Sequence, residues 1–288
     1  MNIDTLPLIE SGYRCENGAV RERNEDACLL FTTGFGGHFG LRPLGLYAVA
    51  DGMGGEREGH VASNAAVRAF GEFVLDRIYL PLLRRLPLRE IDLLDTLEQA
   101  VFVAHDAVAH DVVAQGNGLP PTTAGGQARN GGTTLTAGLI FGRRLYVAHV
   151  GDSRAYLLAG GELRLLTEDH SLVRRLQETG RLSAEEAPHY QYRNVLLQAL
   201  GQAGALTADT FALDLPDEGK LLVCSDGLCG LVPSDELAAV LRDKATAQQT
   251  ADRLYELAMA AGGEDNISAV VVAFSFQGAP PFRPNADD

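Results

Sequence analysis

Short apolar segments joined by tight, glycine-containing turns occupy the centre of this chain and constrain its fold more than any other feature. We predict strands there at residues 133–141, 143–150, 155–158 and 162–166. Turns this short join antiparallel neighbours, because a parallel pair needs a crossover connection of about a dozen residues or more. The pattern therefore predicts antiparallel hairpins and argues against a doubly wound parallel sheet.

Further strands and helices are predicted on both sides of this centre. Short apolar runs bounded by turn formers indicate buried strands, and apolar residues with helical periodicity indicate helices. Strands are predicted at residues 26–31, 44–50, 220–225 and 267–276, and helices at 58–78, 89–115, 170–180, 234–242 and 247–261. Loops are predicted at residues 34–40, 116–132 and 181–194, the second of which is rich in glycine.

The size and composition of the chain favour one large domain. It has 288 residues, of which 46% are hydrophobic and 22% charged, so it carries enough apolar material for a sizeable core. No internal repeat is visible. We predict a single domain over residues 1–276, followed by a Pro-containing, acidic tail at 277–288 that frays.

The charge balance limits the partners that the chain can bind. It carries 24 Lys and Arg against 38 Asp and Glu, which leaves a formal net charge of −14. A chain this acidic would repel nucleic acid or an anionic membrane, so neither is expected as a partner. If it handles phosphate, a cation must bridge the two.

The four cysteines and the N-terminal segment indicate where the protein works. Cys15, Cys28, Cys224 and Cys229 have no regular spacing, so they predict neither a disulfide framework nor a zinc site. The N-terminal residues lack the charged and apolar regions of a signal peptide, and no apolar run is long enough to span a bilayer. We therefore expect a cytoplasmic protein in a reducing compartment.

Four acidic segments lie where a predicted strand meets a turn. They are Arg-Glu-Arg-Asn-Glu-Asp at 21–26, Ala-Asp-Gly-Met-Gly-Gly at 50–55, Cys-Ser-Asp-Gly at 224–227 and Glu-Asp-Asn-Ile at 264–267. A single Asp-Gly pair is often only a turn former. Four such junctions are better explained by a shared site, because strand ends at one edge of a sheet are close in space.

Carboxylates that converge without basic partners repel one another unless a cation compensates their charge. Hard oxygen ligands of this kind suit Mg²⁺ or Mn²⁺ rather than zinc. Gly52, which has no side chain, would let its own carbonyl approach such a metal. Two metals of this kind can activate a water against a phosphate ester, and Arg21 can offer its guanidinium to the phosphate oxygens. The alternative for Arg21 is an ordinary surface arginine.

These segments, in this order, resemble the protein phosphatase 2C family, also called the PPM family, of metal-dependent Ser/Thr phosphatases. The resemblance runs from about residue 12 to residue 274 and includes Gly-Gly-Thr-Thr at 131–134 and Val-Gly-Asp-Ser-Arg at 150–154. It implies an α+β fold, a four-layer α/β/β/α sandwich of two antiparallel sheets flanked by helices, with the metal site at one end. It also implies hydrolysis of phosphoserine and phosphothreonine on proteins.

The resemblance assigns roles to the acidic residues. Asp51 would bridge both metals as a catalytic residue, the Gly52 carbonyl would bind one of them, and Asp226 and Asp265 would bind the other. Arg21 would be the second catalytic residue and would bind the substrate phosphate.

Three further acidic residues would act around these ligands. Glu25 and Asp26 would act mainly through metal-bound waters. Asp152 would join a third, weaker metal site, although an ion pair with Arg154 or a cap on a turn is an equal alternative. Residues 181–194 correspond to a variable flap beside the active site, where substrate selectivity is expected.

One position departs from the family pattern. Many eukaryotic members carry a histidine two residues after the bridging aspartate, where this chain has Met53. A thioether cannot be a general acid, so the chain is similar to the bacterial branch, and another group must protonate the leaving group. Bacterial members commonly reverse Ser/Thr kinases, so a companion kinase is an expected partner and a monomer the expected state.

A binding module and a serine hydrolase are the two alternatives to a phosphatase. A phosphatase-like module that binds phosphoproteins without hydrolysis remains open, although such modules usually lose metal ligands that this chain retains. A serine hydrolase at Ser153 is disfavoured, because no nucleophile-elbow spacing surrounds that residue. His149 and His170 are expected to make structural hydrogen bonds.

Overall fold

A computed structural model of the protein describes residues 8–35, 42–54, 58–84, 86, 88–115 and 131–276. The predicted tail at 277–288 and most of the predicted loops at 34–40 and 116–132 lie outside these residues. Among the described residues, no helix combines the length and the apolar character needed to cross a membrane.

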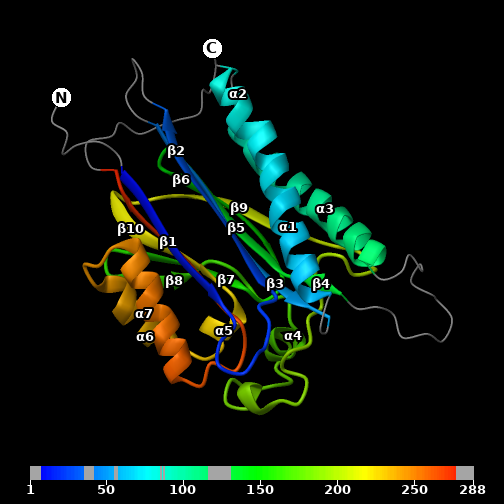
Figure 1. The fold of residues 1–288 in the computed structure, drawn as a ribbon. Coiled ribbons are helices and arrows are strands. Elements are labelled where there is room, and N and C mark those ends of the chain that lie inside the picture. The colour runs from blue at the N-terminus through cyan, green and yellow to red at the C-terminus, as the bar shows by residue number, and fades with distance from the viewer. Residues whose placement is uncertain are drawn as a thin grey trace.

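Two antiparallel sheets form the centre of the molecule (Figure 1). The first sheet has the strand order β1 (Leu8–Glu16), β11 (Ile267–Ser275), β10 (Glu218–Cys224), β7 (Arg154–Ala159) and β8 (Glu162–Leu165). The second has the order β2 (Asp26–Phe35), β3 (Arg42–Met53), β5 (Leu135–Phe141), β6 (Arg144–Val150) and β9 (Asp209–Asp214), and the short β4 (Gly132–Thr133) pairs with β3. The antiparallel hairpins expected from the central sequence are confirmed.

Helices cover the outer face of each sheet (Figure 1). On the second sheet lie α1 (Gly59–Val74) and α3 (Glu90–Gln115), with a π-helical turn (Leu75–Tyr79) and α2 (Leu80–Leu83) continuing α1. On the first sheet lie α6 (Ser234–Arg242) and α7 (Ala247–Ala260). The shorter helical segments are α4 (Leu172–Glu178), a 3₁₀ turn (Ala187–His189) and α5 (Asp226–Cys229). The four-layer α/β/β/α sandwich is confirmed.

Strands at the centre of the sheets are buried on both faces, which explains their nearly continuous apolar sequences. In β3, Leu46 and Ala48 pack toward α1 and α3, whereas Tyr47 and Val49 pack between the two sheets. Successive side chains of a strand point to opposite faces, so one apolar run supplies both cores.

Several strands and helical segments differ from the sequence predictions. The strands β1 and β9 were not predicted because they lie at sheet edges, where mixed polar and apolar residues are only partly buried. The helix predicted to end at residue 78 continues to Leu83 through the π-helical turn just before Pro81, which has no N–H to donate. The one-turn helix α5, which begins at Asp226, was also not predicted.

Candidate active site

The four predicted acidic segments meet at one end of the sandwich. Asp26 begins β2 and is the register partner of Asp51 near the end of β3. Asp226 lies two residues after the end of β10, and Asp265 lies two residues before β11, which pairs with β10. Antiparallel pairing therefore places the end of one strand beside the start of its neighbour in each sheet, and all four segments contribute to one cavity at the same end of the sandwich.

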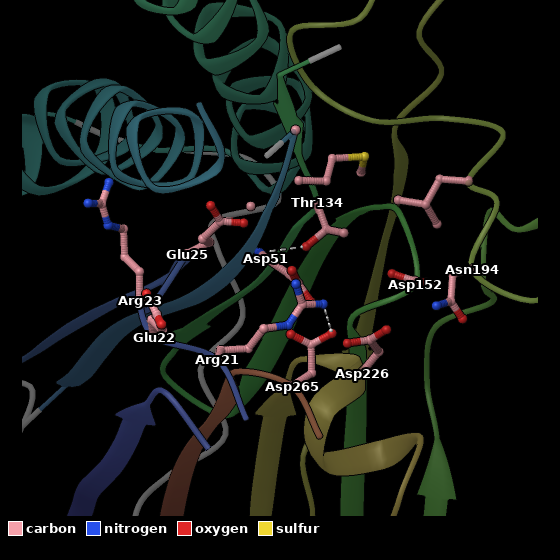
Figure 2. A pocket seen from close by; sticks show the side chains of 14 residues that line it. Arg21, Glu22, Arg23, Glu25, Asp51, Thr134, Asp152, Asn194, Asp226 and Asp265 are labelled. Carbon is pink, nitrogen blue, oxygen red and sulfur yellow. Dashed lines mark hydrogen bonds and ion pairs between the residues drawn. The ribbon is translucent and has the colours of Figure 1, made fainter. Parts of the chain in front are cut away.

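A cavity of about 740 Å³ opens at this end. Within the described residues its carboxylate lining consists of Glu22, Glu25, Asp51, Asp152, Asp226 and Asp265, and its basic lining of Arg21 and Arg23. Figure 2 shows Glu25 and Arg23 on one side of the cavity and Asp152 and Asn194 on the opposite side. Six acidic side chains thus share one space with two arginines.

The backbone of Asp51 is held by the threonines at the start of the central hairpins. Thr133 Oγ1 and Thr134 N–H both donate hydrogen bonds to the Asp51 carbonyl, at 2.8 and 2.9 Å. The Asp51 N–H donates to Thr134 Oγ1 at 2.9 Å, and that hydroxyl lies 2.7 Å from Ser153 Oγ. The segments at 131–134 and 150–154 therefore position Asp51, a role that sequence reasoning did not assign to them.

Gly52 is required by the close approach of three chain segments. A Cβ atom at this position would lie 2.2 Å from the Gly59 carbonyl oxygen and 2.4 Å from that of Glu25. The Gly52 N–H donates to the Glu25 carbonyl at 3.1 Å. Crowding of the backbone thus explains this glycine independently of any metal.

Burial and mutual repulsion oppose ionisation of the clustered carboxylates. Burial raises the pKa of Asp51 well above its usual range, and the carboxylates of Asp26 and Asp226 raise it further. Burial followed by the charge of Asp226 raises the pKa of Asp152 to about 8. Burial is also the main cause that raises the pKa of Asp226. A cation bound among these groups would restore their charged forms.

Asp26 lies behind the cavity rather than in its lining. Its Oδ2 accepts a hydrogen bond from Ser225 Oγ at 2.8 Å, while its Oδ1 is buried and has no hydrogen-bond partner among the described residues. Burial raises the pKa of Asp26 to about 8. An unpartnered buried carboxylate oxygen is costly, so this atom fits a site completed by a cation and its water.

Arg21 reaches the cavity and forms an ion pair with Asp265, with 2.8 Å between Nη2 and Oδ2 (Figure 2). Next to Asp265, Asn266 Oδ1 accepts the Glu25 N–H at 2.9 Å, and Asn266 Nδ2 donates to the Arg23 carbonyl at 2.9 Å. Asn266 thereby ties the loop that carries Arg21 and Glu25 to the start of β11. Sequence reasoning did not identify this role of Asn266.

Asp152 faces the cavity, and its neighbour Arg154 is engaged elsewhere. Arg154 Nε and Nη2 donate to the two carboxylate oxygens of Asp169 at 2.8 and 2.7 Å. Within the described part of the chain, Arg154 makes no ion pair with Asp152. The alternative ion pair between Asp152 and Arg154 is therefore not formed, and Asp152 lines the cavity instead.

The predicted flap contributes Asn194 to the cavity, and Leu196 just beyond it lines the same space. The Leu172 N–H donates to the Val195 carbonyl and the Leu197 N–H donates to the His170 carbonyl, both at 2.8 Å. These bonds dock the end of the flap onto the start of α4.

His149 and His170 are structural, as expected. His149 Nδ1 lies 2.9 Å from Thr136 Oγ1 and its Nε2 lies 3.0 Å from the Glu168 carbonyl. The His170 ring accepts the Gly151 N–H at 3.3 Å. Both rings therefore support the segment that carries Asp152.

The donor set fits a hard divalent cation, because carboxylate and carbonyl oxygens dominate the cavity. In the part of the chain that the structure describes, no group of three or more His, Cys, Asp or Glu side chains already has metal-binding geometry. The Asp265 carboxylate is paired with Arg21 in this arrangement.

Residues 19–269 match the family model described as "Protein phosphatase 2C". The chain belongs to the protein phosphatase 2C family. It is 37% identical to the serine/threonine phosphatase stp of Listeria monocytogenes, over 90% of this chain and 94% of that relative. This confirms the predicted family and activity, so the protein is a metal-dependent Ser/Thr protein phosphatase.

Solved structures of this family share the fold. The serine/threonine phosphatase PstP/Ppp of Mycobacterium tuberculosis has 32% sequence identity and a TM-score of 0.72, covering 92% of this chain and 97% of that one. A structure of the PstP catalytic domain in complex with two manganese ions has 31% identity and a TM-score of 0.72, covering 93% and 99%. The predicted fold class is confirmed by these neighbours.

Proposed function

We propose that this phosphatase 2C member removes phosphate from phosphoserine and phosphothreonine residues of proteins at the carboxylate cavity, using two Mn²⁺ or Mg²⁺ ions. The observation that carries this proposal is the convergence of Asp51, Asp226 and Asp265 with Arg21 on one cavity. Bound there, the two ions would activate a water and neutralise charge on the transferring phosphoryl group.

Each residue has a role set by its position. Asp51, held by Thr133 and Thr134 in the middle of the cluster, would bridge the two ions, and the Gly52 carbonyl would contact one. Asp226 and Asp265 would hold the other ion. The rigid backbone at these residues keeps the metal-binding oxygen atoms in position before the substrate arrives.

The outer carboxylates would support this centre. Glu25 lines the cavity and Asp26 stands behind it, so both would act through ordered water rather than by direct contact. Asp152, on the opposite wall, would hold a third and weaker ion. The described position of Asp152, facing the cavity, favours this role over a purely structural one.

Arg21 would change partners when substrate binds. Its guanidinium pairs with Asp265, but both side chains are partly exposed, at 53% and 40% of their side-chain surface, and can separate at modest cost. Released from Asp265, the guanidinium can offer two parallel N–H groups to the phosphate oxygens.

Met53 cannot protonate the leaving serine or threonine oxygen. Its thioether lines the cavity and accepts a weak hydrogen bond from Gln202 Nε2 at 3.6 Å. The proton must therefore come from another group at the open cavity, such as a water molecule.

We further propose a single catalytic domain that acts as a monomer in the cytoplasm, in signalling, on phosphoproteins made by a companion Ser/Thr kinase. Four free cysteines and a net charge of −14 are consistent with a reducing compartment and with protein rather than nucleic-acid substrates. The flap beside Asn194 would select among these substrates.

The deciding experiment measures hydrolysis of para-nitrophenyl phosphate and of a phosphothreonine peptide by the purified protein, first in EDTA and then with added Mn²⁺ or Mg²⁺. Turnover that requires the metal supports the proposal, and the ratio of the two rates ranks the two ions. Absence of turnover with every divalent ion, in protein shown to be folded, would favour the phosphoprotein-binding module instead.

A further inference from the structure

The edge strands of the two sheets lie side by side close to the active site. β1 is the edge of the first sheet and β2 is the edge of the second, and the two strands pack against each other. Ser11 Oγ on β1 lies 3.2 Å from Thr32 Oγ1 on β2. This contact fixes which residues of the two strands face each other across the gap between the sheets.

Two cysteines face each other farther along the same strands. Cys15 lies four residues after Ser11, and Cys28 lies four residues before Thr32, so antiparallel strands bring the two thiols together. The Cys15 thiol donates to the carbonyl of Asp26, and Cys28 lies two residues after Asp26 on the same face of β2, so the two cysteine side chains lie close to each other. Both are free thiols and both are only partly buried.

The Cys15 sulfur is also tied to the segment that precedes the metal site. It accepts a hydrogen bond from Asn24 Nδ2 at 3.3 Å, and its S–H donates to the Asp26 carbonyl at 3.7 Å. The same Asn24 accepts the Asp26 N–H through Oδ1 at 3.1 Å. Cys15 thus contacts Asn24 and Asp26 directly, so a movement of Cys15 would also shift Asp26 and its neighbour Glu25.

We propose that Cys15 and Cys28 are a redox modification site, a dithiol that closes into a reversible disulfide between the two sheets and weakens metal binding. The required oxidant is a peroxide. Cys15, which contacts the metal-site segment, would react with the peroxide first, and Cys28 would then attack the sulfenic acid formed on Cys15.

The chemistry balances with hydrogen peroxide as the oxidant. The Cys15 sulfur attacks one peroxide oxygen, so an S–O bond forms, the O–O bond breaks and one water leaves. Cys28 then attacks the Cys15 sulfur, which forms the S–S bond, breaks the S–O bond and releases a second water. The two sulfurs are oxidised and the peroxide is reduced, and an added dithiol reverses the change by thiol–disulfide exchange.

Closing the disulfide removes the S–H group that donates to the Asp26 carbonyl and pulls Cys15 toward Cys28, because the S–S bond is much shorter than the contact between two thiols. The segment at 24–26 would then lose its two hydrogen bonds to the Cys15 sulfur. Changes in groups that orient metal ligands typically cost about tenfold or more in metal affinity or activity, and a loss of that size is expected here.

A second cysteine pair provides an internal comparison. Cys224, at the end of β10, and Cys229, at the end of α5, belong to the same hydrophobic cluster. Both are buried in the core under α6 and α7, with exposed fractions of 0% and 9%. A peroxide reaches this pair less easily, so the Cys15–Cys28 pair should react first.

The first test treats the full-length, reduced protein with hydrogen peroxide and maps disulfides by mass spectrometry after trypsin digestion. Trypsin cleaves after Arg21 and Arg23, so Cys15 and Cys28 fall on different peptides and a linked product is recognised directly. The expected result is a 15–28 link that dithiothreitol removes. No link, or a link only between Cys224 and Cys229, would overturn the proposal.

The second test measures Mn²⁺ affinity by calorimetry before and after oxidation, so that it does not depend on phosphatase turnover. Wild type should lose about tenfold in affinity and regain it with dithiothreitol. Cys15→Ala and Cys28→Ala should lose this response, whereas Cys229→Ala should keep it, each compared with its own reduced form. Linked protein that binds Mn²⁺ as well as reduced protein would refute the coupling to the metal site.

Discussion

At the scale of single residues, the site combines carboxylates that repel one another with backbone contacts that prevent them from moving apart. The backbone of Asp51 accepts hydrogen bonds from Thr133 and Thr134 and donates one to Thr134, and its carboxylate lies beside that of Asp226. Repulsion between these carboxylates therefore destabilises the site locally, and a bound cation would remove that repulsion.

Asp226→Ala tests whether the clustered carboxylates serve metal binding at the expense of local stability. It removes a proposed metal ligand and also relieves repulsion with Asp51, so activity should fall by about a hundredfold or more while stability changes little. Turnover of the phosphothreonine peptide and a thermal unfolding curve, both recorded in Mn²⁺ and in EDTA, measure the two effects. A folded variant with full activity would show that the site is wrongly assigned.

Arg21→Ala should raise KM for a phosphopeptide by roughly tenfold, because a charge-assisted hydrogen bond to phosphate is lost. Arg23→Ala is the matched control: it removes the same charge from the same cavity, but its parent side chain is not the one paired with Asp265. An unchanged KM in Arg21→Ala, or an equal rise in both variants, would count against a specific role for Arg21.

The same two variants separate competition for Asp265 from a general charge effect. Arg21 pairs with the Asp265 carboxylate, which we propose as a metal ligand, so Arg21→Ala should bind Mn²⁺ more tightly than Arg23→Ala does. Calorimetric titration of the two metal-free variants gives this comparison. Equal affinities would mean that the Arg21–Asp265 ion pair does not oppose metal binding.

At the scale of secondary-structure elements, the edge strand β1 is held by close packing against α7. A Cβ atom on Gly12 would lie 2.3 Å from the Gln248 N atom and 2.4 Å from its Cα. The register with β11 places this glycine opposite Val271, in the middle of β1. A backbone-to-backbone approach of this kind leaves no flexible side chain that could yield.

Gly12→Ala should therefore destabilise the fold by about 2 kcal/mol, within the usual cost of overpacking. Urea unfolding followed by circular dichroism measures the change in free energy. Ser11→Ala, on the same strand but without added volume, should cost less than half as much. If Gly12→Ala unfolds at the wild-type urea concentration, the contact between β1 and α7 is looser than described.

At the scale of the whole molecule, one buried histidine gives stability a dependence on pH. Burial, with the nearby His170 second, lowers the pKa of His149 to about 4 from the ordinary value of 6.5. The unfolded chain therefore binds this proton more readily than the folded one, so stability is retained above about pH 6.5 and falls as the pH drops toward 4.

The expected loss from His149 alone is roughly 3 kcal/mol on going from pH 7.5 to pH 4. Urea unfolding at several pH values should show a smaller acid-induced loss for His149→Gln, whose amide can retain hydrogen bonds to Thr136 and to the Glu168 carbonyl. If wild type and variant lose stability in parallel, His149 is not the group that titrates.

Patterns local in sequence determined much of this protein. The tight central turns predicted antiparallel strands, and the acidic residues at predicted strand ends predicted a shared cavity, because strand direction and strand end can be read from neighbouring residues. The edge strands β1 and β9 were not predicted from the sequence, because partial burial leaves no clear alternation of polar and apolar residues.

Only the tertiary structure decided how distant residues pair. The irregular spacing of the cysteines predicted no disulfide framework and gave no sign of a pair, yet the meeting of two sheet edges brings Cys15 close to Cys28. In the same way, Arg21 meets Asp265 across the whole length of the chain, and Arg154 pairs with Asp169 rather than Asp152. The sequence determines which side chains stand at each strand end. Which of them come into contact depends on how the two sheets pack against each other, and local sequence does not specify that packing.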